Sequence, residues 1–159
     1  MARWNRSALL MVAALVVCCG SLPAQTPKSI TIRVLDPHTG KALVTSSVLI
    51  RVDHQKTVHA NWVALNEDLT GKATLPADAA LLAAQASYDN TMELYINCDS
   101  VKDNPPTGPH WYKLSDILAT GVVAANGCSK RTAAAKPGEF ILFARRKNWH
   151  DSIEQDFTE

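Results

Sequence analysis

Five histidines are the side chains in this sequence best suited to serve as a general base or a metal ligand. They are His38, His54, His59, His110 and His150. None stands in a His-Glu-x-x-His or comparable spacing, which zinc sites built on one element use. His54 and His59 are five residues apart, and on a strand this odd spacing points two side chains to opposite faces. The spacing therefore predicts surface or turn histidines and neither a metal nor another cofactor.

Sequence motifs for covalent catalysis and for nucleotide binding are absent. No serine lies in a Gly-x-Ser-x-Gly elbow, and no glycine-rich loop precedes a helical segment, so acyl transfer and nucleotide binding lack support. Folding can still bring distant side chains together. A small secreted hydrolase or metal-dependent enzyme that uses His110, His54 or His59 therefore stays open as the alternative to a non-enzymatic protein.

An aromatic pair follows the proline-rich segment 103–110. His110 ends this segment, and Trp111 and Tyr112 come directly after it. Adjacent aromatic rings at the end of a loop can stack on a sugar or receive a side chain of a partner protein. The alternative is that Trp111 covers the edge of the core. We take His110, Trp111 and Tyr112 as candidate binding residues.

The first 24 residues have the three parts of a secretory signal peptide. Arg3 and Arg6 form a positive head, residues 7–19 are mostly apolar, and Ala24 ends the segment with a small side chain. This pattern predicts cleavage after Ala24. The apolar run is too short for a membrane-spanning helix, which needs about 20 residues. The predicted product is periplasmic or secreted, without a stable membrane span.

Two other fates of this segment stay open. A lipoprotein signal needs a small residue before its cysteine, whereas Val17 precedes Cys18 and Cys18 precedes Cys19. The segment could also stay uncleaved as an anchor.

The mature chain, residues 25–159, has the length and charge of one ordinary soluble domain. Losing Arg3 and Arg6 leaves 14 basic against 15 acidic residues. A nucleic-acid partner, which would call for clustered positive charge, is therefore not expected. Cys98 and Cys128 are the two cysteines that remain, and in an exported domain they predict a disulfide. The first alternative is that both cysteines are free thiols. A metal site is the last alternative, because it would need ligand pairs closer together in the sequence.

Short strands separated by turn signals predict a mainly β fold. Period-two alternation marks strands at 29–35 and 44–53, joined as a hairpin by the turn Asp36–Gly40, and at 91–99 and 139–145. Weaker signals mark strands at 57–67, with Trp62 and Ala64 on one side, and at 72–75. Helices are expected at 78–86, where alanine and leucine dominate, and at 115–120, capped by Ser115 and stopped by Gly121.

These elements predict a single antiparallel β-sandwich with one or two short helices. The predicted core consists of Ile30, Ile32, Val34, Val48, Ile50, Val52, Met92, Leu94, Ile96, Phe140 and Leu142. Cys98 falls on the same alternating face as Ile96, so its sulfur is expected to point toward the core.

Residues 34–43 read Val-Leu-Asp-Pro-His-Thr-Gly-Lys-Ala-Leu, and Ser-Val-Leu-Ile follows at 47–50. This stretch resembles the opening of carboxypeptidase regulatory-like domains, which are transthyretin-like β-sandwiches of exported bacterial proteins. Residues 66–76 are similar to the second turn of that family. Ile32 and Arg33 stand where a glycine is usual. The resemblance covers the N-terminal half and implies a transthyretin-like fold, an envelope setting and no active site. The expected role is that of a non-catalytic module that binds an envelope protein or a glycan.

Overall fold

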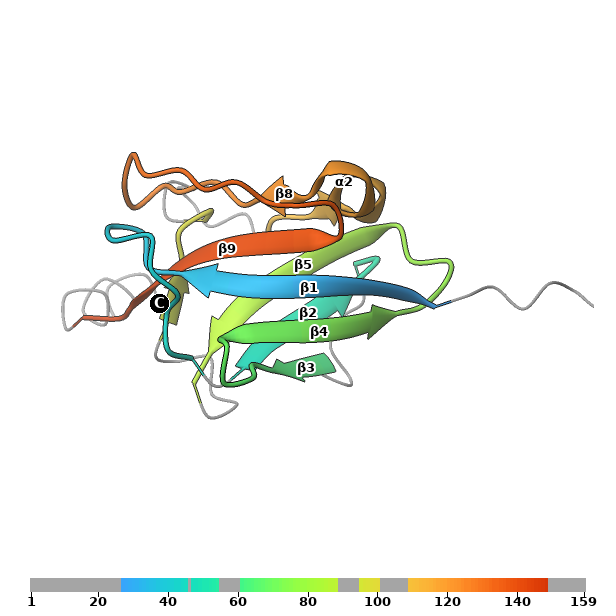
Figure 1. Cartoon of the computed structure of the whole chain (residues 1–159), viewed down its shortest axis with the longest axis horizontal. Coiled ribbons are helices and arrows are strands. Elements are labelled where there is room, and N and C mark those ends of the chain that lie inside the picture. Colours follow the sequence, from blue (N-terminus) through green and yellow to red (C-terminus); the bar gives the residue numbers. More distant parts are fainter. Residues whose placement is uncertain (1–26, 46, 55–60, 89–94, 101–108, 149–159) are drawn as a thin grey trace, which may run out of the picture.

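Two β-sheets packed face to face form the body of the molecule (Figure 1). The computed structural model describes residues 27–45, 47–54, 61–88, 95–100 and 109–148. The elements are β1 (Lys28–Leu35), β2 (Ser47–Val52), β3 (Asn61–Ala64), β4 (Thr70–Leu75), β5 (Leu81–Ser87), β6 (Tyr95–Asn97), β7 (Tyr112–Lys113), α2 (Leu114–Thr120), β8 (Val122–Val123) and β9 (Glu139–Arg146). One sheet has the order β4-β1-β9-β6, with β8 beside β9, and the other has the order β3-β2-β5-β7. The prediction of a mainly β, two-sheet fold is confirmed.

The space between the sheets is filled by alternate residues of the strands. The predicted core residues that lie there are Ile30, Ile32, Val34, Val48, Ile50, Val52, Phe140 and Leu142. Met92 and Leu94 lie outside the described residues. In β6 the predicted face is wrong, because Tyr95 and Asn97 are buried while Ile96 is only half-buried.

The predicted hairpin between the first two strands is wrong. The turn itself forms, because Asp36 Oδ1 accepts hydrogen bonds from the N–H groups of Thr39 (2.7 Å) and His38 (3.0 Å). After an isolated bridge between Leu35 and Ala42, however, the chain crosses to the other sheet. β1 pairs with β4 and, in parallel, with β9, so this sheet is mixed and not purely antiparallel as predicted.

The predicted helix at 78–86 is also wrong. Most of this stretch is β5, which lies between β2 and β7. Leu82, Ala84 and Ala86 face the core, and Ala83 is buried on the opposite face. A strand covered on both faces reads as a continuous apolar run, which in sequence cannot be told from a buried helix. Tertiary pairing here overrides the helix propensity of alanine.

Two smaller expectations also change. β3 buries Val63, whereas Trp62 is half-buried and Ala64 is exposed, the reverse of the predicted face. The helix α2 ends at Gly121 as predicted, but its N-cap residue is Lys113 and not Ser115.

None of the helices in the described part of the chain is long and apolar enough to cross a membrane.

Candidate functional site

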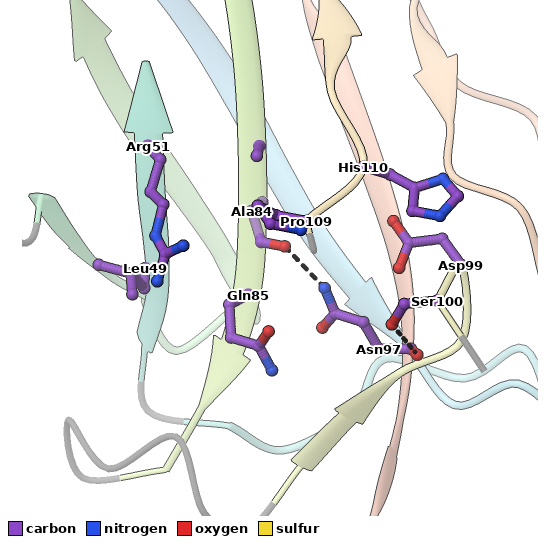
Figure 2. A pocket seen from close by; sticks show the side chains of 10 residues that line it. Leu49, Arg51, Ala84, Gln85, Asn97, Asp99, Ser100, Pro109 and His110 are labelled. Atoms are coloured by element: carbon purple, nitrogen blue, oxygen red, sulfur yellow. Dashed lines mark hydrogen bonds between the residues drawn. The ribbon is translucent and has the colours of Figure 1, made fainter. Parts of the chain in front are cut away.

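A hollow of about 220 Å³ lies over the outer face of the β2–β5 pair (Figure 2). Its residues come from β2, from β5, from the turn that begins at the end of β6, and from the segment before β7. They are Leu49, Arg51, Ala83, Ala84, Gln85, Asn97, Asp99, Ser100, Pro109 and His110. Figure 2 shows Arg51 on one side and Asp99 with His110 on the opposite side.

The pairing register of β2 and β5 produces the hollow. Leu49 lies opposite Gln85, and Arg51 lies opposite Ala83. Because side chains alternate along a strand, all four project on the face away from the core. Ala83 has the shortest of these side chains and, like Leu49, is buried, whereas Arg51 and Gln85 are half-buried and border the hollow. A small residue between long ones thus opens a space of limited size.

Asn97 forms one wall and joins the two sheets. Its Nδ2 donates to the carbonyl of Ala84 at 2.7 Å, and its Oδ1 accepts from the N–H of Ala86 at 3.2 Å. Asn97 belongs to β6 of one sheet, whereas both alanines belong to β5 of the other. The buried amide is therefore fully engaged and holds the wall in place.

Asp99 is a buried carboxylate held from behind the pocket. The hydroxyl of Tyr112 donates to Asp99 Oδ2 at 2.6 Å, and the ring of Tyr112 packs against Phe140 with a centroid separation of 4.9 Å. Burial, followed by the hydrogen bond to Asp99 and its charge, raises the pKa of the Tyr112 phenol well above its usual value. The phenol therefore stays protonated and serves as a fixed donor to the carboxylate.

The pocket brings Ser100 and His110 close to Asp99, which raises the question of a catalytic triad. Figure 2 shows the imidazole of His110 beside the Asp99 carboxylate. The Ser100 hydroxyl, however, donates its single proton to the Asn97 carbonyl at 3.2 Å. A nucleophilic serine needs that proton to be taken by a base. In this arrangement Ser100 supports the turn and is not activated.

The predicted disulfide between Cys98 and Cys128 is present, with a Cα–Cα separation of 5.3 Å. Its surroundings differ from the expectation, because Cys98 is buried with Leu35, Ile141 and Phe143 in a second cluster. This cluster lies on the outer face of the β1–β9 pair, away from the main core, and is covered by the segment that contains Cys128. The bridge anchors the residue directly before Asp99 and so steadies one side of the pocket.

The three predicted binding residues fall in three different places. His110 lines the pocket. Trp111 is half-buried, and the centroid of its ring lies 4.3 Å from the centroid of the His54 ring. Tyr112 points inward to Phe140 and Asp99. Their binding roles stay predictions, with His110 in the best position to touch a ligand.

Sequence reasoning did not single out Arg51, Gln85, Asn97 or Asp99 as site residues. The sequence held one signal for Arg51, a charged residue between the buried Ile50 and Val52. Its partner Gln85 was hidden by the wrong assignment of the segment to a helix. Asp99 carries no signal of its own in the sequence, because the turn that brings it to the pocket depends on non-local contacts.

In the described part of the chain, no three His, Cys, Asp or Glu side chains are grouped so that they could hold a metal ion. His59 and His150 lie outside the described residues.

A scan against models of known protein families finds no match for this chain, and a search of curated proteins finds none either. The resemblance to carboxypeptidase regulatory-like domains therefore stays a prediction, and the site is interpreted from its geometry.

Proposed function

We propose that this protein is an exported, non-catalytic module that binds one sugar unit of a glycan in the pocket over β2 and β5. The observation that carries the proposal is the convergence of polar groups from four separate stretches of chain around one hollow. These polar groups suit the hydroxyls of a sugar, and the apolar parts of the lining suit its C–H groups. Pockets for drug-sized ligands exceed about 300 Å³, so a hollow of about 220 Å³ fits a single ring.

Export is supported by two independent features. Residues 1–24 have the pattern of a cleavable signal peptide. The Cys98–Cys128 disulfide is of a kind that persists in oxidising compartments outside the cytoplasm. The resemblance of residues 34–50 adds an envelope setting and, for the two-sheet body, a transthyretin-like topology.

Binding without catalysis is supported by the state of the polar groups. The Ser100 hydroxyl, the Asn97 amide and the Asp99 carboxylate all take part in hydrogen bonds within the protein. Such groups are fixed in position, which lowers the entropy lost when a ligand is bound. The Gln85 amide has no hydrogen-bond partner in the described part of the chain, and it is the group that a sugar hydroxyl would engage.

A glycan array probed with the exported protein tests this function. We expect binding to a subset of oligosaccharides and its loss or clear weakening in Gln85→Ala. The matched control is Asn66→Ala, which removes an exposed amide outside the pocket and should bind as the native protein does. Binding that is equal in the two variants, or no binding to any glycan, would overturn the proposal.

Intact mass of the same product should show a chain that begins at Gln25. Retained residues 1–24 or a lipid on Cys18 or Cys19 would contradict the expected processing.

A further inference from the structure

Arg51 gives the pocket a positive charge without an internal partner. In the described part of the chain its guanidinium makes neither a hydrogen bond nor an ion pair. Other arginines are engaged: Arg33 pairs with Glu139, and Arg131 donates to the carbonyl of His38. The acidic residue nearest to Arg51 in the sequence is Asp53, and its carboxylate accepts hydrogen bonds from the N–H groups of Ala80 and Leu81. Arg51 is thus a half-buried cation that faces the hollow with its donors unused.

The charges at the two ends of the pocket are opposite. Arg51 stands on one side, and the Asp99 carboxylate stands on the other beside His110 (Figure 2). An anionic ligand group is attracted to the Arg51 side and repelled from the Asp99 side. Ligand hydroxyls fit the Gln85 amide, which has no hydrogen-bond partner in the described part of the chain. The ligand should therefore carry an anion toward Arg51 and hydroxyl groups toward Gln85.

We propose that the pocket selects an acidic sugar, a uronic acid unit whose carboxylate is bound by Arg51. This inference rests on the proposed glycan-binding function and adds the ligand class. A guanidinium and a carboxylate are both planar and can form two parallel hydrogen bonds. The hydroxyls of the same sugar would then reach the Gln85 amide, which lines the same hollow. An acidic side chain of a protein would use Arg51 but would bring no hydroxyl to the Gln85 amide, which has no hydrogen-bond partner in the described part of the chain.

The experiment compares matched sugars by isothermal titration calorimetry, with galacturonic acid against galactose and glucuronic acid against glucose. The protein is recovered as the exported product of the full chain. We expect the acid of at least one pair to bind about ten- to a hundredfold more tightly than its neutral partner, as for a charge-assisted contact. This preference should decrease as sodium chloride is added.

Arg51→Gln should remove the preference for the acid and leave weak binding of both sugars. Lys130→Gln removes one positive charge from an exposed residue outside the pocket and should keep the preference. Thermal unfolding of each variant verifies that it is folded. Equal affinity of the native protein for acid and neutral sugars would overturn the inference while the glycan-binding function stands. Binding of neither sugar of either pair, or tighter binding of free glutamate than of either acidic sugar, would overturn both.

Discussion

The side chain of Asn97 pairs with the backbone on either side of Gln85 in the way that a residue of a parallel strand would. In a parallel pair, one residue donates to the carbonyl before its partner and accepts from the N–H after it. Asn97 does this with one amide group, through Ala84 and Ala86. The pairing of β5 with β7 is restricted to Leu81 and Leu82. Asn97 therefore satisfies an edge of β5 that β7 leaves open, and such edges are otherwise liable to pair with other chains.

Asn97→Ala should lower the free energy of unfolding by about 3 kcal/mol, because the Ala84 carbonyl and the Ala86 N–H lose their partner in a buried place. Urea unfolding measures the change. The control Asn66→Ala, at an exposed position, should stay within about 0.5 kcal/mol of the native protein. If Asn97→Ala lost no more stability than the control, water would be replacing the amide and Asn97 would not hold the sheets together.

Tyr112→Phe keeps the ring against Phe140 but removes the donor to Asp99. We expect a loss of about 1.5–3 kcal/mol at neutral pH, the range for a hydrogen bond to a charged group. Thr74→Val, which removes a hydroxyl from an exposed residue, should change stability by less than about 0.5 kcal/mol. Similar stability of both variants in urea unfolding would contradict the supporting role of Tyr112.

The same phenol predicts a fall in stability at alkaline pH. The pKa of Tyr112 is raised by burial and by Asp99, so above about pH 10 the unfolded chain loses the proton first. Stability is then fully present below that pH and declines as the pH rises toward the folded pKa. Stability of the Tyr112→Phe variant should decline less steeply with pH. Part of the decline that remains should come from Tyr95, because burial raises the pKa of that phenol too. An unchanged slope of stability against pH would contradict this assignment.

Local signals in the sequence predicted the Asp36 turn and the core faces of β1, β2 and β9, but not those of the short strands β3 and β6, and pairing between distant strands was out of reach. The Asp36 turn and the core faces of β1 and β2 depend on neighbouring residues, and they form as predicted. Which sheet β2 joins depends on β5, a segment whose alanines also favour a helix. The same dependence hid the pocket, because Arg51 and Gln85 become neighbours only through the β2–β5 register. His110 was found because it follows a proline-rich loop.

The disulfide should contribute roughly 3 to 4 kcal/mol to stability, since it closes a loop across a sequence separation of 30 residues. Cys98→Ser with Cys128→Ser should therefore shift the urea midpoint to lower concentration, and reductant should shift the native protein in the same direction. The double variant itself should not respond to reductant. Alkylation of the unfolded, unreduced protein should label neither cysteine, and labelling of both would show that the bridge is absent.

Two glycines with nearly the same φ provide a test of packing at the end of α2. Gly121 has φ +79° and Gly138 has φ +78°, and both donate to the carbonyl of Ile117. A Cβ on Gly121 would meet the Lys136 carbonyl oxygen at 2.2 Å, whereas a Cβ on Gly138 meets nothing within 4 Å. Gly138→Ala should therefore cost only the left-handed strain of about 1–2 kcal/mol. Gly121→Ala adds a backbone clash, and the ψ of 154° at Gly121 lies in a region that is essentially restricted to glycine, so it should cost at least about 2 kcal/mol more. Urea unfolding of the two variants measures the difference, and equal losses would show that the 135–138 segment moves away from the helix end without cost.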